Sequence, residues 1–536
     1  MMQSGGIHAI ELILLLLLVF VVAFAALARK LQTPYPIVLV IAGLLLSFLP
    51  GIPKISLNPD VVFLVVLPPL LYSAAWLTSW REFKFNLVSI CMLAFGLVGF
   101  TVLGVAGAAR WVFPGFDWRL GFVLGAVIAT TDAIAATSIA KRVGLPHRIV
   151  DILEGESLVN DATGLLALEF GVSMVVSAQT PTVGDGFLRL TYLTFAGLAL
   201  GLIVGIIVER IHRHIDDGPI EITLTILVPY VAYLGAEAIH SSGVLAVVAC
   251  GLYLSHKSSQ FFSANVRIQA WAVWDSLTFI LNGLVFVLIG LQLHFVLAGI
   301  REYSFPQLLK YGALFSALVI VLRMIWMFPG AYIANLIRRH VLHQPVPMPS
   351  VRQIFVVGWT GMRGVVALAA AISLPETLAD GSPFPQRNLI LFLTFSVILV
   401  TLVLQGSTLP PLIRALGLAG AVGHHSEEEG ARKAMIEAAL ARLEEARKKE
   451  GDDFPGIYED LEQRYKHRLA NLTGQDNEEI GANPAKYARY FALTRELLRA
   501  ERRTAVKLRN ENRINDEVLR KLEHELDLSD ARLSLM

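Results

Sequence analysis

Charge is scarce in this chain. Asp, Glu, Lys and Arg together make up 17% of the 536 residues, whereas a soluble globular domain carries about 25%. Apolar side chains make up 55% of the chain, and its mean hydropathy is +0.59. The formal net charge is +1 and there is no basic patch to hold phosphates, so we expect no nucleic-acid partner. The composition indicates a membrane protein.

Cysteine is nearly absent, and no motif in the chain is specific for an enzyme. Cys91 and Cys250 both lie inside apolar runs, where cysteine behaves as a small buried hydrophobic residue. Gly155 and Ser157 superficially resemble a nucleophile motif, but their apolar run contains no histidine. The sequence also contains no metal-ligand spacing. We therefore expect neither an enzyme nor a cofactor.

Long apolar runs dominate the chain instead. Each has roughly 20 residues, the length that spans a bilayer as an α-helix. The runs begin near Ile10, Pro36, Val61, Asn86, Leu120, Ile149, Phe187, Ile220, Gly243, Trp271, Lys310, Ile354 and Asn388, and the last ends near Leu416. The sequence thus predicts an all-α polytopic membrane protein with about 13 transmembrane helices. An odd number of spans places the termini on opposite sides of the membrane.

Basic residues in the short loops predict the orientation, because cytoplasmic loops carry an excess of Lys and Arg. If the N-terminus is external, the inner loops contain Arg29, Lys30, Arg81, Lys84, Lys141, Arg142, Arg148, Arg210, Arg213, Lys257, Arg267, Arg338, Arg339 and Arg352. The outer loops then contain only Lys54, Arg110, Arg119, Arg189, Arg301, Lys310 and Arg387. We therefore expect an external N-terminus and a cytoplasmic C-terminus. The lack of long external loops favours a bacterial plasma membrane.

The last part of the chain has a different composition. Residues 421–536 are rich in Glu, Arg, Lys and Leu, and the segments 431–449 and 499–526 show helical spacing with mixed charges. Residues 1–420 are thus expected to form the transmembrane domain, and residues 421–536 a solvated helical tail in the cytoplasm. A regulatory or self-association role for the tail stays open, because nothing in it identifies a ligand.

Isolated charges inside the apolar runs are candidates for function, because a charged side chain at the bilayer centre costs roughly 2.5–3.5 kcal/mol. They are Asp132, Glu156, Asp161, Glu169, Glu237, Asp275, Arg323 and Arg363. Glu169 and Asp275 lie near the ends of their runs, where water could reach them. Glu237 and Arg323 are expected to join or cap helices. The other four charges lie in three short polar segments.

The segment from Glu154 to Asp161 is the densest of these. On a helix, residues four apart share a face, so Ser157 lies beside Asp161. Glu156 lies beside Asn160 on the adjoining face. A carboxylate and a hydroxyl supply hard oxygen ligands that suit a small cation. We predict that Asp161 is the ion-binding carboxylate and that Glu156 holds an arginine; a hydrogen-bond network that only joins helices is the alternative.

Two apolar runs are expected to break. Thr130, Thr131 and Asp132 interrupt the fifth run, and their side chains can hydrogen-bond to their own backbone. The twelfth run carries three glycines and a threonine between positions 358 and 364, and these are poor helix formers. Interrupted spans in different halves of a chain are typical of transporters built from inverted repeats, whose helix ends line the ion site. The sequence therefore predicts an inverted-repeat core with two broken, crossing helices.

Arg363, inside the second of these breaks, requires an anionic partner. Glu156 is the expected partner. Such an ion pair would be structural, because it neutralises itself and leaves Asp161 free to bind an ion.

Taken together, these segments resemble the monovalent cation:proton antiporters of the sodium/proton exchanger type. Each motif alone is weak, but their combination in this order, over about residues 8–416, is specific. The matching segments are Leu67–Leu71, Thr131–Asp132, Gly155–Asp161, Glu237–Ala246, Trp274–Phe286, Gly290–Leu293 and Gly361–Gly364.

The resemblance implies a homodimer, a moving core and a set of site residues. Core helices at about 86–178 and 308–416 would move against dimer-interface helices at about 8–80 and 187–297. The implied site has Asp161 as the cation- and proton-binding carboxylate, with Asp132, Thr131, Ser157 and Asn160 around it, Na+ held at Asp161 and Asp132, and Glu156 paired with Arg363. The adjacent Asn160 and Asp161 resemble the electroneutral branch of the family.

Two positions depart from the family pattern. Ala133 stands where proline usually follows the aspartate of the broken span. Ser73 follows Tyr72 of the third span, where many relatives have an acid, and the missing carboxylate is expected either to weaken cation affinity or to change the choice between Na+, Li+ and K+. Ser73 is an accessory candidate of the expected site, and Thr130 and Arg323 are two further accessory candidates.

We expect a secondary active antiporter that exchanges Na+, or alternatively Li+ or K+, for H+ by alternating access. Its expected partners are these ions, membrane lipid and a second copy of the chain. A carboxylate in a partly desolvated cavity can be neutralised by a proton or by a cation. If only the neutralised forms cross the membrane, the two ions must exchange. A K+/H+ or broad monovalent exchanger would use the same residues, and a cation channel is the less favoured alternative.

Overall fold

In the computed structural model, the regular secondary structure of the described residues is helical. The described residues are 4–48, 59–113, 116–176, 183–215, 217–300, 303–344, 347–378, 380–420, 423–450, 455–473, 484–511, 513, 518–519, 522–523 and 525–529. The one strand-like feature within them is an isolated bridge between Thr377 and Pro383. The chain divides into two compact units, Met1–Ala421 and Val422–Met536. The all-α prediction is confirmed for the described residues.

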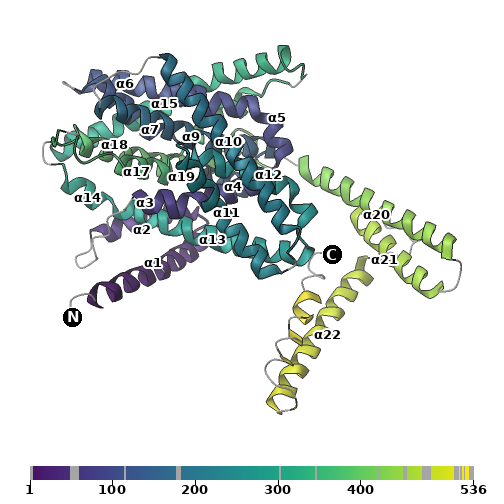
Figure 1. Ribbon diagram of the computed structural model, residues 1–536. Coiled ribbons are helices and arrows are strands. Elements are labelled where there is room, and N and C mark those ends of the chain that lie inside the picture. The colour runs from purple at the N-terminus through teal and green to yellow at the C-terminus, as the bar shows by residue number, and fades with distance from the viewer. Residues whose placement is uncertain are drawn as a thin grey trace. The chain divides into compact units, whose positions relative to one another are not determined.

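The first unit is a bundle of apolar helices (Figure 1). Its α-helices are α1 (Ser4–Lys30), α2 (Tyr35–Ser47), α3 (Pro59–Val61), α4 (Leu67–Leu77), α5 (Trp80–Cys91), α6 (Val98–Val112), α7 (Trp118–Ala129), α8 (Ala133–Val143), α9 (His147–Val176), α10 (Val183–His212), α11 (Gly218–Ala238), α12 (Gly243–Phe261), α13 (Ala264–Leu291), α14 (Leu293–Ala298), α15 (Phe305–His340), α16 (Val351–Trp359), α17 (Val365–Ile372), α18 (Arg387–Val400) and α19 (Gly406–Ala415). Three π-helical turns join neighbouring helices: η1 (Val62–Val66), η2 (Met92–Leu97) and η3 (Thr401–Gln405).

Each predicted apolar run coincides with one of these helices or with a consecutive group of them. Within the described part of the chain, nine such helices are long and apolar enough to cross a membrane. The multi-pass membrane character is therefore confirmed. The number of about 13 spans stays a prediction, because elements such as α2 are shorter than a bilayer is thick.

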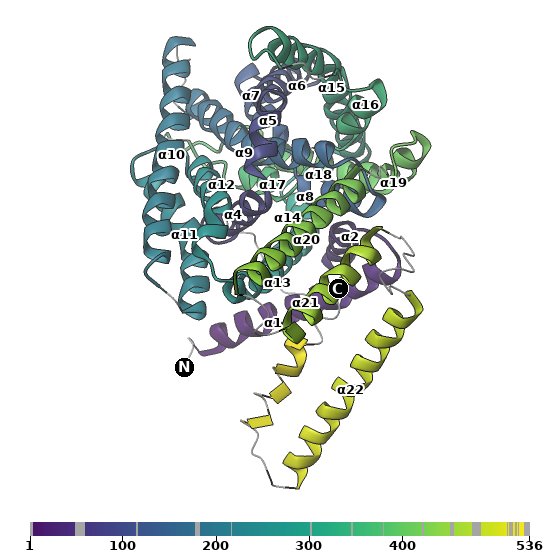
Figure 2. The same cartoon turned by 90° about the vertical axis from the view of Figure 1, so that its right-hand side faces the viewer.

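Small residues allow the helices to approach one another closely. A Cβ atom on Gly43 of α2 would lie 2.5 Å from the carbonyl oxygen of Val287 of α13, and a Cβ on Gly201 of α10 would lie 2.2 Å from that of Ala246 of α12. Membrane helices associate by such close packing, since lipid supplies no hydrophobic drive between them. Figure 2 shows the resulting group of α10, α11 and α12 side by side.

The two predicted helix breaks are confirmed. The first separates α7 from α8 at residues 130–132, and the second separates α16 from α17 at residues 360–364. The two breaks lie side by side, because the backbone N–H of Asp132 donates to the carbonyl oxygen of Met362 at 2.8 Å. Asp132 also starts α8 as its N-cap, since its Oδ1 accepts from the N–H of Ile134 at 2.8 Å. A side-chain cap thus starts the helix without the proline that Ala133 replaces.

The second unit is also helical and carries a mixed-charge surface. It contains α20 (Gly423–Glu450), α21 (Pro455–Thr473) and α22 (Pro484–Asn510). Arg447 of α20 reaches Glu462 of α21 at 3.9 Å, and Glu462 pairs with Lys466 one turn on at 2.6 Å. That hydrogen bond lowers the pKa of the Glu462 carboxyl. The helical character predicted for segment 431–449 is confirmed.

Candidate ion-exchange site

A buried ion pair joins α9 to α15. Nη1 and Nη2 of Arg323 donate to Oε1 and Oε2 of Glu156 at 2.5 and 2.9 Å, and both side chains are 1% exposed. Arg323 also donates from Nε to the carbonyl oxygen of Gly358 and from Nη2 to that of Val357, both at 3.1 Å. These carbonyls lie in the last turn of α16, where helix carbonyls lack partners and favour a cation. Arg323 therefore neutralises Glu156 and caps the first half of a broken helix.

The predicted pairing of Glu156 with Arg363 is wrong. Nη1 of Arg363 donates to the carbonyl oxygens of Ala129 and of Thr130, the latter at 2.9 Å. Those two carbonyls end α7, so Arg363 caps the other broken helix. The two arginines thus occupy equivalent positions, each at the C-terminal end of a half-helix. Arg323, expected only as an accessory residue, holds the carboxylate because it reaches Glu156 from α15.

Arg363 is held in place by a residue that the sequence did not single out. Its backbone N–H donates to Oγ1 of Thr401 at 3.1 Å. Thr401 begins η3 and is fully buried, and π-helical turns are frequent at functional sites. The one available signal was a hydroxyl in the thirteenth apolar run.

Thr131 is the centre of a polar network at the first break. Its Oγ1 donates to Oε1 of Glu156 at 3.1 Å and accepts from Nδ2 of Asn160. Its carbonyl oxygen accepts from Oγ of Ser157 at 2.9 Å, and the N–H of Ala133 donates to that same Oγ at 3.3 Å. Proline could not donate this last bond, so the alanine fastens the break to α9. Ser157 lies one turn before Asp161 as predicted, but its proton is directed to the backbone of the break.

Asp161 and Asp132 are the two carboxylates that this network leaves available. Asp161 is 6% exposed, and no described residue donates a hydrogen bond to its carboxylate or pairs with it. Oδ2 of Asp132 is buried and likewise has no partner among the described residues. Asp132 fits because Gly364 has no side chain: a Cβ there would lie 2.1 Å from this oxygen.

Both carboxylates line one cavity of about 230 Å³ between α4, α8, α9, α13 and α17. Its other polar lining residues are Ser73, Thr130, Thr131, Thr137, Ser157, Thr278 and Asn282, together with Lys141 and Glu154, which form an ion pair of 2.8 Å. Carboxylate, hydroxyl and amide oxygens are the ligands that small hard cations prefer. Thr278 and Asn282 were not predicted as site residues, although they lie in the segment Trp274–Phe286 that carries part of the resemblance.

The remaining candidates lie outside this cavity. Glu169 is exposed and pairs with Arg189 at 3.1 Å. Glu237 is exposed. Asp275 is exposed as well and lines a smaller cavity of about 80 Å³ beside Trp274. Glu169 and Asp275 are thus exposed on the protein surface, and their solvation stays a prediction.

Two broken helices that meet beside buried carboxylates, within a multi-pass helical bundle, are typical of a secondary transporter. The sodium/hydrogen exchanger transmembrane family model matches residues 15–415. The chain belongs to this family of transporters.

Individual relatives agree with this assignment. A protein of Mycobacterium bovis, named as an uncharacterized Na+/H+ exchanger, is 33% identical over 99% of this chain and 97% of its own. A sodium, potassium, lithium and rubidium/H+ antiporter of Bacillus pumilus is 33% identical over 77% of this chain and 62% of its own. The structure of a sodium proton antiporter from Methanocaldococcus jannaschii is similar with a TM-score of 0.61, at 22% identity over 76% of this chain and 99% of that one. This last similarity concerns the fold.

Proposed function

We propose that the protein exchanges Na+ for H+ across a membrane and that both ions compete for the carboxylate of Asp161. The observation that carries the proposal is the separation of charges in the site. Glu156 is neutralised by Arg323, whereas Asp161 and Asp132 face the cavity without a basic partner among the described residues. A cation that enters the cavity therefore meets two uncompensated carboxylates.

Competition follows from the physics of a shielded carboxylate. Removing such a group from water disfavours its charged form, and either a proton or a cation relieves that cost. The carboxylate of Asp161 cannot readily hold a proton and a cation at the same time, so the two ions compete for it. If the neutralised forms cross and the bare anion does not, inward movement of one ion requires outward movement of the other.

The remaining ligands support a small cation. Asp132 also lines the cavity, while Ser157, Thr131 and Asn160 position the break and α9 around it. Ser73 lines the same cavity with a hydroxyl. We propose Na+ as the principal substrate. Li+ and K+ are further substrates to test, since the Bacillus pumilus relative is named for several monovalent cations.

Exchange of one Na+ for one H+ would be electroneutral. The residue beside Asp161 is the uncharged Asn160, and the proposal assigns the alternation between the two ions to the carboxylate of Asp161 alone. Because one elementary charge moves in each direction, the membrane potential does no net work on the cycle.

The proposed setting is a bacterial plasma membrane with the N-terminus outside and the C-terminal unit in the cytoplasm. The excess of Lys and Arg in the inner loops supports this orientation. We further propose a homodimer formed through helices within 8–80 and 187–297, against which the core helices 86–178 and 308–416 move. The exposed apolar side chains of Leu188, Phe195 and Ile203 on α10 supply a surface for lipid or a second copy.

The test uses purified protein in liposomes that enclose a pH-sensitive dye. Addition of Na+, Li+ or K+ outside should drive proton movement that saturates with cation concentration. Lowering the pH should weaken the apparent Na+ affinity, and clamping the membrane potential with valinomycin and K+ should leave the rate unchanged. Proton flux without cation dependence would refute exchange, and flux that follows the clamped potential would refute electroneutrality alone.

A further inference from the structure

A second cavity lies between the core helices and contains none of the proposed exchange residues. It has a volume of about 110 Å³ and is lined by residues of α5, η2, α9, α15 and α16. Most of its wall is apolar, including Leu93, Ile149, Met327, Ile354 and Val357. This cavity has no function in the exchange mechanism described above.

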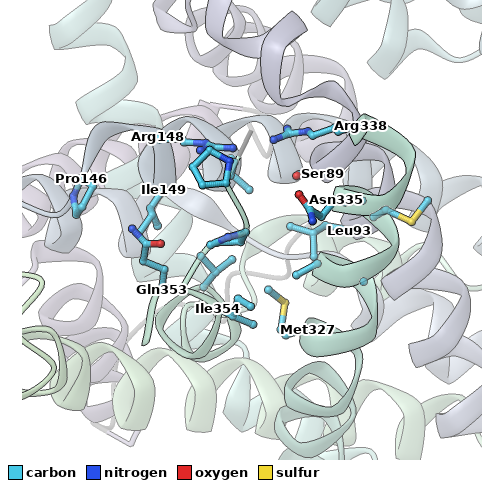
Figure 3. A pocket seen from close by; sticks show the side chains of 18 residues that line it. Ser89, Leu93, Pro146, Arg148, Ile149, Met327, Asn335, Arg338, Gln353 and Ile354 are labelled. Atoms are coloured by element: carbon cyan, nitrogen blue, oxygen red, sulfur yellow. The ribbon is translucent and has the colours of Figure 1, made fainter. Parts of the chain in front are cut away.

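One end of the cavity is strongly basic. Figure 3 shows the guanidinium groups of Arg148 and Arg338 at one end of the pocket, with Met327 and Ile354 at the other. Both guanidinium groups stack on the ring of Phe85, with their Cζ atoms 5.4 and 5.5 Å from the ring centroid. Two positive charges on the same aromatic ring repel each other.

No described carboxylate compensates this pair by direct contact. Arg338 is 4% exposed and donates from Nη2 to the carbonyl oxygen of Phe85 at 3.1 Å and to Oδ1 of Asn86 at 3.4 Å. Its Nε is buried without a partner among the described residues. Glu82 acts on Arg148 electrostatically but lies beyond ion-pair distance. Two arginines without a carboxylate in direct contact thus line the cavity together, and one of them has an unused buried donor.

We propose that this cavity binds an anionic phospholipid, with the phosphate between Arg148 and Arg338 and the start of an acyl chain along the apolar wall. Basic pockets between membrane helices on the cytoplasmic side bind such head groups, and Arg suits phosphate because its planar fork donates two hydrogen bonds. Exposed apolar side chains surround this region, including Leu336, Met348 and Val351. They would keep the rest of the acyl chains in the membrane. A free anion would satisfy the arginines but would leave the apolar wall uncovered.

The chain offers a matched control for each part of the proposal. Arg339 neighbours Arg338 at the same end of α15, but it is exposed and does not line the cavity. Comparing Arg338→Gln with Arg339→Gln therefore removes the same charge at nearly the same depth. Ala331→Leu adds volume inside the cavity while both arginines stay in place.

Binding can be measured by native mass spectrometry and thermal shift of the full-length protein in detergent. The probes are dioleoyl phosphatidylglycerol, dioleoyl phosphatidylcholine and inorganic phosphate. We expect the wild type and Arg339→Gln to bind the phosphatidylglycerol alike. Arg148→Gln combined with Arg338→Gln should weaken phosphatidylglycerol binding about thirty-fold, because each arginine contributes about 1 kcal/mol of binding free energy. Ala331→Leu should weaken phosphatidylglycerol binding at least several-fold. The wild type should retain less phosphatidylcholine than phosphatidylglycerol.

Three results would overturn the proposal. Equal effects of Arg338→Gln and Arg339→Gln would show only general attraction of basic residues to anionic lipid. Stabilisation by inorganic phosphate as strong as by phosphatidylglycerol, with Ala331→Leu unaffected, would indicate a site for a free anion. Retention of phosphatidylcholine equal to that of phosphatidylglycerol would show that the head-group charge is not recognised. Because Ala331→Leu keeps the basic end intact, a folding defect in the arginine variants would still leave the lipid site testable.

Discussion

Glu156 of α9 and Arg323 of α15 form a bidentate ion pair, with donor–acceptor distances of 2.5 and 2.9 Å. Removing one partner of a buried pair leaves an uncompensated charge, at a cost of about 3–5 kcal/mol. Glu156→Gln combined with Arg323→Gln should be less destabilised than the sum of the single variants. The corresponding cycle with Arg363→Gln should be close to additive.

The cycle is measured as free energies of unfolding of the purified protein in detergent micelles. We expect a coupling energy above about 1 kcal/mol for Glu156 with Arg323, as for contacting residues in one network. Coupling should be clearly smaller with Arg363. Arg339→Gln, at an exposed position, is the control for loss of a basic residue. A larger coupling with Arg363 than with Arg323 would contradict the pairing.

Gly364 is predicted to be required for exchange because of its contact with Asp132. In Gly364→Ala, the new Cβ would lie 2.1 Å from Oδ2 of Asp132. The backbone at Gly364 has φ −138°, which any residue adopts, so the effect is steric. We expect at least a ten-fold loss of Na+-driven proton flux in liposomes. Gly107→Ala, with nothing within 4 Å of its added Cβ, should retain the wild-type rate; equal rates for both variants would show that Asp132 need not stay where it is.

Thr131 is predicted to hold the break through its hydroxyl. Thr131→Val removes the donor to Glu156 and the acceptor for Asn160, and an unsatisfied buried polar group costs about 1–3 kcal/mol. Thr131→Ser keeps the hydroxyl and should lose much less stability. Melting temperatures and exchange rates of the two variants give the comparison. If the valine variant were as stable and active as the serine variant, the network would have no such role.

Lys141 is predicted to lower the affinity of the cavity for cations, because it lines that cavity beside Glu154. Lys141→Gln removes a positive charge and frees the carboxylate of Glu154. The apparent KM for Na+ should fall about two- to five-fold at low ionic strength, and the difference should shrink when choline chloride screens the charges. Arg142→Gln is the control, since Arg142 bonds to the carbonyl oxygen of Gln32 outside the cavity. A KM that changes equally in both variants would indicate a general charge effect.

The sequence predicted the broken helices better than it predicted the contacts between them. Local composition sufficed for the breaks, because threonines and an aspartate at 130–132 and glycines at 358–364 weaken any helix. It also predicted that Glu156 holds an arginine. Which arginine depends on the packing of α15 against α9, and spacing along the chain contains no information on that distance. The sequence likewise could not predict the direction of the Ser157 hydroxyl, because its rotamer depends on the hydrogen-bond partners that the fold supplies.

The most direct test of the account is Na+-driven proton flux through Asp161→Asn in liposomes. No described residue donates a hydrogen bond to this carboxylate or pairs with it, so the variant should fold with a melting temperature close to that of the wild type. Glu169→Gln, which changes an exposed acid, is the matched control and should transport at the wild-type rate. The account predicts that Asp161→Asn gives no more flux than protein-free liposomes. Transport by Asp161→Asn at the wild-type rate would contradict it.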